Sequence, residues 1–308
     1  MANLSNEQIH EIRTRLVELK KNNPQYSDRV IGKNIGYSGG YVNLFLQNKF
    51  PSPSTEGEFA EKAINFLNTE LTRTRDNVTK EHLKFAPTNA SQKIFKIVNY
   101  CIATGKLGLI IGDNGFGKTI SLREYCKKNT TSIMIEVLPI ATPKSTLDDI
   151  ASRLRIQSCY SRAETFDSII LRLQDTARVL IIDEAEYLNT ASLEIIRRIH
   201  DFTNIPMILS GKSILQKKLL GPRGKLQQLS SRIGIQEEIK GFDLNDIRSV
   251  LSLNFPEAVK FSSTFLQLSK QNGRLLEHLI SLVKSTMNET GEQLSDDLID
   301  DAACSLLT

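Results

Sequence analysis

The stretch Gly112-Asp113-Asn114-Gly115-Phe116-Gly117-Lys118-Thr119 decides the fold of this chain. It follows an apolar run at residues 107–111 and precedes a predicted helix that begins at Ile120. Glycines allow such a loop to take left-handed conformations and to turn successive backbone N–H groups towards phosphate oxygens. The lysine of this pattern reaches the β- and γ-phosphates, and the hydroxyl after it can bind Mg²⁺. The sequence therefore predicts a site for ATP and Mg²⁺ that is formed by residues 112–119 together with Ile120.

A second motif supplies the carboxylates that such a site needs. The apolar run at residues 179–182 ends in Asp183 and Glu184. Runs of this kind are typical of central parallel strands, whose carboxyl ends open onto the ligand site. We expect Asp183 to hold Mg²⁺ together with Thr119, and Glu184 to orient and polarise the attacking water, because phosphoryl transfer depends on positioning and charge stabilisation. The predicted reaction is therefore Mg²⁺-dependent ATP hydrolysis, with Lys118 and Glu184 as catalytic residues.

The region around both motifs alternates between two periodicities. Helices are expected at residues 92–104, 120–128, 146–154, 166–174 and 191–202, and strands at 107–111, 133–137, 179–182 and 207–210. Such alternation predicts an α/β fold with a parallel sheet between two layers of helices. From residue 245 onward only helical periods occur, which predicts a small all-α lid. We therefore expect an ATPase core at residues 90–240 and the lid at 241–308.

The N-terminal part has the pattern of a separate all-helical domain, residues 1–71, followed by a polar linker at 72–89. Ser27 and Ser38 can begin two short helices at 28–34 and 39–47, and Gly36 can end the first of them. Two short helices joined by such a turn are typical of a helix-turn-helix, whose second helix enters the DNA major groove. In this reading Tyr41 and Lys33 are candidates for DNA contact. A small helical domain for protein interaction is the alternative.

Composition places the chain among ordinary globular proteins, with 40% hydrophobic and 24% charged residues. No apolar run approaches the roughly 18 residues that a membrane span needs, and the first ten residues lack the apolar segment of a signal peptide. We therefore expect a cytoplasmic protein with no membrane association. The four cysteines are scattered without a C-x-x-C pair, which supports neither a zinc site nor a disulfide framework.

The net charge of +4 is too small to predict nucleic-acid binding, but the distribution of charge is informative. Residues 212–232 contain six basic side chains and no acidic one. The six are Lys212, Lys217, Lys218, Arg223, Lys225 and Arg232. Such a segment can contact a polyphosphate, either DNA or the nucleotide of a neighbouring subunit, or it can be a solvated loop.

A nucleotide-binding core followed by a helical lid resembles the AAA+ ATPases. The resemblance implies a polar sensor near the γ-phosphate, for which Ser210 and Ser213 are both candidates at the end of the strand 205–209. It also implies that Arg232, in Ser230-Ser231-Arg232, is an arginine finger that projects into the site of the adjacent subunit. Arg274 resembles the second sensor, although it follows Gly273 directly and the family's more usual spacing is three residues.

Within the AAA+ proteins, the order of parts resembles the Mu B-type target-selection ATPases of transposing phages and transposons. The predicted helix-turn-helix ends in Phe45-Leu46-Gln47-Asn48-Lys49-Phe50, the carboxylate motif continues as Asp183-Glu184-Ala185-Glu186-Tyr187-Leu188, and Ser231-Arg232-Ile233 follows the basic segment. The resemblance implies an ATP-dependent helical oligomer on double-stranded DNA, with little sequence preference, that delivers target DNA to a transposase. The expected partners are therefore DNA, a transposase and further copies of the chain.

Three alternatives share some of these motifs. A helicase loader or replication initiator of the same fold would differ only in its partner. A helix-turn-helix transcription regulator with an ATPase switch would read a defined, palindromic site. A nucleotide kinase is the third alternative, but nothing in the sequence resembles a phosphate-acceptor pocket, and the glutamate beside Asp183 suits water activation.

Overall fold

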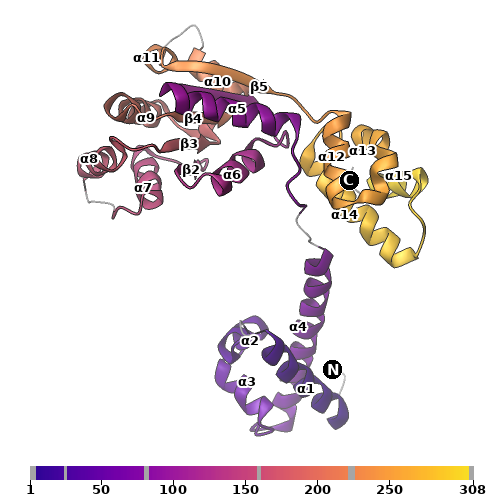
Figure 1. Ribbon diagram of the computed structural model, residues 1–308. Helices are drawn as coiled ribbons and strands as arrows, with labels where there is room; N and C mark the ends of the chain where they lie inside the picture. Colours follow the sequence, from indigo (N-terminus) through magenta and orange to yellow (C-terminus); the bar gives the residue numbers. More distant parts are fainter. Residues whose placement is uncertain (1–4, 24–25, 80–82, 158–160, 221–225, 305–308) are drawn as a thin grey trace. The chain divides into compact units, whose positions relative to one another are not determined.

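The computed structural model describes residues 5–23, 26–79, 83–157, 161–220 and 226–304. The chain divides into two compact units, Met1–His82 and Leu83–Thr308. Figure 1 shows the helices of the first unit in indigo and violet and the sheet and helices of the second from violet to yellow. Among the described residues, no helix is long and apolar enough to cross a membrane.

The N-terminal unit is built from four helices around one apolar core. They are α1 (Asn6–Asn22), α2 (Asp28–Ile35), α3 (Gly39–Leu46) and α4 (Pro53–Thr79). Ser5 begins α1 with a capping box, in which its side chain and that of Gln8 each accept from the other's backbone N–H. Phe45 and Phe59 are fully buried, with ring centroids 4.7 Å apart, and they anchor α3 on α4. Aromatic packing therefore holds the short helices in place.

The helices α2 and α3 are joined by the three residues 36–38. Gly36 ends α2 in the left-handed conformation, with φ 78°, and Ser27 caps its start through the backbone N–H of Val30. Val42 and Phe45 of α3 are buried, whereas Tyr41 is 39% exposed and stands against the Tyr37 ring with centroids 5.6 Å apart. Tyr41 therefore lies on the solvent side of α3 and still contacts the ring of Tyr37.

The helix α4 extends further than the sequence predicted. It runs from Pro53 to Thr79, and therefore includes residues 72–79, which the sequence predicted to begin a linker. Neither proline nor glycine occurs between residues 58 and 79, so nothing in the backbone interrupts the helix despite its polar composition.

The second unit contains a parallel sheet. Among the described residues the strands are β1 (Leu107–Gly112), β2 (Ser132–Glu136), β3 (Val179–Asp183), β4 (Met207–Gly211) and β5 (Ile233–Ile239), in the order β2-β3-β4-β1-β5. All pairs are parallel, with Glu136 beside Asp183, Ile110 beside Ser210 and Gly112 beside Ile239. Because the carboxyl ends of parallel strands share one edge, the two nucleotide motifs meet there.

Helices cover both faces of this sheet, as the sequence predicted (Figure 1). They are α5 (Asn89–Thr104), α6 (Lys118–Lys128), α7 (Pro143–Arg153), α8 (Arg162–Leu173) and α9 (Thr190–Thr203), followed by α10 (Ser213–Leu220) and α11 (Gln227–Ser230). Alternate residues of β1 serve the two faces: Leu107 and Leu109 pack with α7 to α11, whereas Ile110 packs with α5 and α6. The strand is therefore apolar throughout.

The strand β5 was not predicted from the sequence. Only Ile239 of β5 is buried, and its other residues alternate between half-buried and exposed. It lies at the edge of the sheet and pairs only with β1 among the described strands. The alternation of Ile233, Gly234, Ile235 and Gln236 was the signal, but Glu237 and Glu238 weaken it.

The lid at the C-terminal end is all-helical, as predicted. It consists of α12 (Leu244–Asn254), the 3-10 segment η2 (Pro256–Phe261), α13 (Ser262–Leu268), α14 (Gly273–Thr290) and α15 (Asp296–Cys304). Its own apolar core includes Leu251, Phe265, Leu279 and Ile299, each fully buried. Asp243 starts α12 with a capping box.

Candidate functional site

The loop between β1 and α6 has the backbone that phosphate binding requires. Gly115 and Gly117 take φ values of 82° and 81°, in the left-handed region that favours glycine. Gly117 precedes the first residue of α6, Lys118. The first N–H groups of a helix have no partner within it, so the end of the loop points unpaired donors and the positive end of the α6 dipole towards a ligand.

The Lys118 side chain turns back over the loop. The residue is buried, with only 7% of its surface exposed. Its ammonium donates to the carbonyl oxygens of Gly112 at 2.6 Å and Asp113 at 3.0 Å. Burial lowers the pKa of this ammonium, while the negative charges of Asp183 and Glu184 oppose the shift. The cation therefore stands at the phosphate end of the loop, held by backbone groups that phosphate oxygens can replace.

The two motifs of the site meet in one contact. The Thr119 hydroxyl donates to Oδ2 of Asp183 at 2.6 Å. Asp183 is fully buried, and its Oδ1 has no hydrogen-bond partner among the described residues. A buried carboxylate oxygen without a partner is costly, whereas carboxylate and hydroxyl oxygens are the ligands that Mg²⁺ prefers. Thr119 and Asp183 therefore fit a Mg²⁺ site and would hold the ion.

Glu184 follows Asp183 in an unusual backbone conformation. Its φ of 55° is left-handed, which is uncommon for a residue other than glycine. The carboxyl is half-buried, and burial raises its pKa, with a further rise from the charges of Glu186 and Asp183. Lys118 and Lys212 oppose that rise. A carboxyl whose pKa is raised is a better proton acceptor. The role of Glu184 in polarising water stays a prediction.

The structure separates the two candidates for the first sensor. Ser210 lies in β4 beside Ile110, is fully buried, and its hydroxyl has no hydrogen-bond partner among the described residues. Ser213 begins α10 and is exposed. The unpaired hydroxyl near the carboxyl end of the sheet makes Ser210 the better candidate for contact with a phosphate.

The lid contributes to the loop in a way that the sequence did not predict. Gly273 donates its N–H to the Gly115 carbonyl at 2.8 Å, and the Asn272 amide donates to the Asn114 carbonyl at 3.0 Å. A Cβ at Gly115 would collide with the Asn272 side chain, and Phe242 packs against Gly117. Asn272 also caps α14, which was its sequence signal. The lid thus touches the phosphate loop directly.

Arg274, the candidate second sensor, is exposed in the first turn of α14, and its backbone N–H donates to the Asn272 side chain at 2.9 Å. It therefore lies two residues from the lid contact with the loop. Its role stays a prediction.

Two of the six basic residues, Lys217 and Lys218, lie on α10. Lys217 is exposed and makes no hydrogen bond or ion pair with any residue that the structure describes. Lys218 donates its ammonium to the carbonyl oxygens of Glu186 and Leu188, the latter at 3.3 Å, and Lys212 lies 3.9 Å from the buried Glu186 carboxylate. Arg223 and Lys225 lie outside the described residues. Lysines of this segment therefore differ in whether they form hydrogen bonds within the described structure, and the sequence alone did not show which ones do.

Arg232 lies at the amino-terminal ends of the strands, opposite the end that carries the phosphate loop. It precedes β5, and its carbonyl accepts from the N–H of Leu107, the first residue of β1. The phosphate loop follows the carboxyl end of β1, six residues further on, roughly 20 Å away at the rise of an extended strand. Arg232 therefore cannot reach the nucleotide site of its own subunit.

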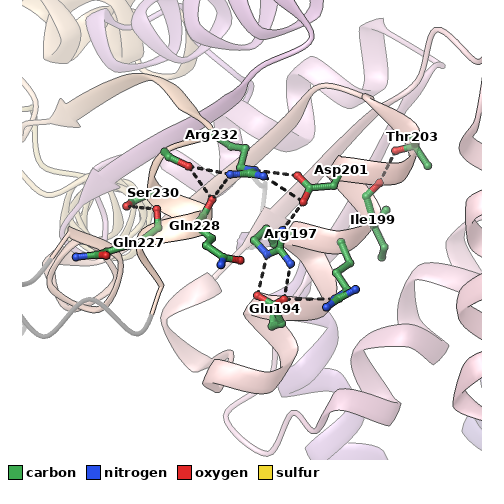
Figure 2. A network of polar contacts seen from close by, with 11 residues as sticks. Glu194, Arg197, Ile199, Asp201, Thr203, Gln227, Gln228, Ser230 and Arg232 are labelled. Atoms are coloured by element: carbon green, nitrogen blue, oxygen red, sulfur yellow. Dashed lines mark hydrogen bonds and ion pairs between the residues drawn. The ribbon is translucent and has the colours of Figure 1, made fainter.

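The guanidinium of Arg232 is engaged on this edge (Figure 2). Its Nε and Nη2 donate to the two carboxylate oxygens of Asp201 at 2.8 and 3.3 Å, and Nη1 donates to the Gln228 carbonyl at 2.8 Å. Asp201 also accepts from Arg197, which forms a two-armed pair with Glu194. Arg232 is 36% exposed in this arrangement, so it lies at the surface where another subunit could meet it.

The candidate DNA contacts of the N-terminal unit are both exposed. Tyr41 lies on the solvent face of α3, and Lys33 lies in the last turn of α2. Their proposed contact with DNA stays a prediction.

Comparison with known proteins agrees with this architecture. The model of the AAA domain family matches residues 102–219, which include both nucleotide motifs. The "ATP-dependent target DNA activator B" of Escherichia phage Mu is 24% identical over 298 residues, 94% of this chain and 93% of that protein. The "Mu-like prophage FluMu DNA transposition protein B" of Haemophilus influenzae is 24% identical over 231 residues, 73% of this chain and 79% of that protein.

Among solved structures, the ORC2 protein of Aeropyrum pernix has the same fold. It superposes with a TM-score of 0.56 at 15% identity, over 74% of this chain and 71% of that one. The matches along the sequence, the order of the sheet and the paired nucleotide motifs together support a Mu B-like AAA+ ATPase.

Proposed function

We propose that this protein is an ATP-dependent, DNA-binding ATPase that oligomerises on target DNA and delivers it to a transposase. The observation that carries the ATPase part is the contact between Thr119 and Asp183, which joins the two nucleotide motifs around an unpaired buried carboxylate oxygen. The transposition part is supported by the similarity to the target DNA activator of phage Mu, which aligns over nearly the whole chain, and to the transposition protein of Haemophilus influenzae.

The proposed hydrolysis follows from the positions of five side chains. Lys118 exchanges its loop carbonyls for the β- and γ-phosphate oxygens. Thr119 and Asp183 would hold Mg²⁺, which would neutralise charge on the phosphates. Glu184 orients the water for attack on the γ-phosphorus and accepts its proton, while the Ser210 hydroxyl donates to a γ-phosphate oxygen.

The site is completed by a neighbouring subunit. Arg232 lies at the amino-terminal ends of the strands, away from its own phosphate loop. In the proposed assembly its guanidinium contacts the nucleotide of the adjacent subunit. An arginine supplied in this way stabilises charge on the transferred phosphoryl group. Hydrolysis therefore requires assembly, and ATP bound at the interface favours it.

DNA binding is proposed to be dominated by phosphate contacts. The exposed Lys217 on α10, and Lys33 and Tyr41 of the predicted helix-turn-helix, are the described candidates with free access to a duplex. An interface of lysines and phosphates carries little sequence information, which suits a protein that accepts many target sites.

Electron microscopy of the purified protein with random-sequence duplex DNA, with and without ATP, tests this proposal. Long, sequence-tolerant coverage of the DNA that depends on ATP is the expected result. A short palindromic footprint at low protein concentration would instead favour the transcription regulator. Absence of any DNA-bound oligomer, in a preparation that hydrolyses ATP, would contradict the target-selection function and leave the ATPase assignment standing.

A further inference from the structure

The turn that follows the catalytic glutamate is held in place by α10. Glu184 takes its left-handed conformation at the start of the short 3-10 segment η1 (Ala185–Tyr187), where its carbonyl accepts from the Tyr187 N–H at 3.1 Å. A left-handed residue other than glycine persists only where its surroundings fix it. The orientation of the Glu184 side chain therefore depends on what holds η1.

Two lysines of the basic segment form hydrogen bonds with η1 and the residue after it. The Lys218 ammonium donates to the carbonyl oxygens of Glu186 and Leu188, at the far end of the turn. The backbone N–H of Lys212 donates to the Glu186 carboxylate at 3.3 Å. The turn is thus attached at one place to the residue just before α10 and at another to the second turn of α10.

The Glu186 carboxylate strengthens this attachment. Only 5% of Glu186 is exposed, and one of its oxygens lies against the backbone of Gly211 at the end of β4, where a Cβ would collide with it. Its charge also acts on Lys118 and on Glu184. The Glu186 carboxylate therefore connects the turn to the end of the strand that carries Ser210 and to the residue just before α10.

The adjacent Lys217 does not contact this turn. Lys217 and Lys218 are both exposed, but Lys217 makes no hydrogen bond or ion pair with any described residue, whereas the Lys218 ammonium donates to two carbonyl oxygens. Lys217 and Lys218 thus have the same side chain and the same charge but differ in their hydrogen bonds.

We propose that Lys218 is a positioning residue for Glu184, through the carbonyl oxygens of η1, and that α10 couples its exposed face to the catalytic turn. This rests on the proposed role of Glu184 in activating water. A DNA duplex that binds the exposed face of α10, at Lys217, then acts on the helix that orients Glu184. Lys218 itself is not a DNA contact, contrary to the expectation from charge alone.

Three variants test the proposal in ATPase assays at saturating duplex DNA. In Lys218→Gln we expect kcat to fall about tenfold to hundredfold, because small misplacement of a catalytic group has effects of that size, with KM for ATP unchanged. Turnover in Lys217→Gln should exceed that of Lys218→Gln at least about tenfold, whereas its DNA affinity should be the lower of the two. Lys218→Arg should recover turnover, since a guanidinium can donate to both carbonyl oxygens. Lys96→Gln removes an exposed lysine of α5 and should match the parent protein.

Chemical labelling of the unaltered protein gives an independent measurement. With an amine-reactive ester and no DNA, Lys218 should react more slowly than Lys217, because its ammonium is bound by two carbonyl oxygens. DNA should then protect Lys217. Equal labelling rates without DNA, or a Lys218→Gln variant with normal kcat and weakened DNA binding, would overturn the proposal. A failure of the proposed function is recognised separately, since Glu184→Gln would then hydrolyse ATP normally.

Discussion

Thr119 and Asp183 come from different motifs and meet through a hydrogen bond of 2.6 Å, which leaves the other Asp183 oxygen buried and without a partner among the described residues. We expect this oxygen to bind a cation. Asp183→Asn keeps the side-chain shape and removes the charge. We expect it to weaken ATP binding in the presence of Mg²⁺ but not in EDTA, because without the cation a carboxylate repels the triphosphate. Titration calorimetry under both conditions measures the difference, and the exposed Asp167→Asn is the control. Equal losses in both conditions would exclude Asp183 as a Mg²⁺ ligand.

Lys118 and Glu184 should give different phenotypes. Lys118→Ala should abolish nucleotide binding because it removes the cation that holds the phosphates. Glu184→Gln should retain ATP and lose turnover by about a hundredfold or more, since charge neutralisation remains while the water loses its base. Equilibrium binding of a fluorescent nucleotide and steady-state ATPase assays separate the two. A normal rate in Glu184→Gln would remove Glu184 from the catalytic role.

The pKa of Glu184 links pH, stability and activity. Burial raises this pKa in the folded protein above the value of about 4.3 expected when the chain is unfolded. Between the two pKa values the folded state binds more protons, so this carboxyl lowers the stability of the fold as pH rises through that window. At pH values above both pKa values, the full loss of folding stability caused by the buried Glu184 carboxylate is present.

Glu184→Gln should therefore melt at the same or a higher temperature than the parent near neutral pH, and the difference should shrink below pH about 4. Parent turnover should rise as pH increases through the raised pKa, because the carboxylate is the active form. Thermal melts and kcat across pH test both effects. A less stable Glu184→Gln at neutral pH would contradict the pKa shift.

Arg232 should act on the neighbouring subunit. Arg232→Ala should still bind ATP, because Lys118, Thr119 and Asp183 of its own site are intact, but it should lose about 10³-fold or more in turnover. Mixed with Lys118→Ala, it should regain activity at interfaces that pair an intact site with an intact arginine. Asp201→Asn serves as the control for the network in Figure 2 and should cost at most about 1 kcal/mol of stability, because the pair is partly exposed. If the co-assembled mixture stays inactive, Arg232 is not the arginine that acts in trans.

DNA affinity should depend steeply on salt. Each lysine that neutralises a phosphate contributes about −0.9 to the slope of log K against log salt concentration. Lys217→Ala should therefore flatten the slope by about that amount per bound subunit, without a change in sequence preference. Fluorescence anisotropy with a duplex of random sequence measures the slope between low and physiological salt. An unchanged slope would direct attention to Lys33 and the N-terminal unit.

The sequence by itself determined the phosphate loop, the paired carboxylates, the parallel sheet and the helical lid. Each of these depends on local chemistry: the loop needs glycines at positive φ, β1 and β3 are apolar because both faces are covered, and the lid helices have their own periodicity. The half-exposed β5 and the extension of α4 to Thr79 were missed, since an edge strand needs few apolar residues and a polar helix needs only the absence of breakers.

The tertiary structure alone decided which residues of similar type have which surroundings. Lys217 and Lys218 are neighbours of equal charge, but only Lys218 reaches the turn after Glu184. Arg232 was identified by its motif, but its place beside Leu107, away from the phosphate loop, follows from the parallel pairing of β1 and β5. Asn272 reaches the loop although it is far from it in the chain. Such relationships depend on how distant segments pack, and no local pattern of residues encodes them.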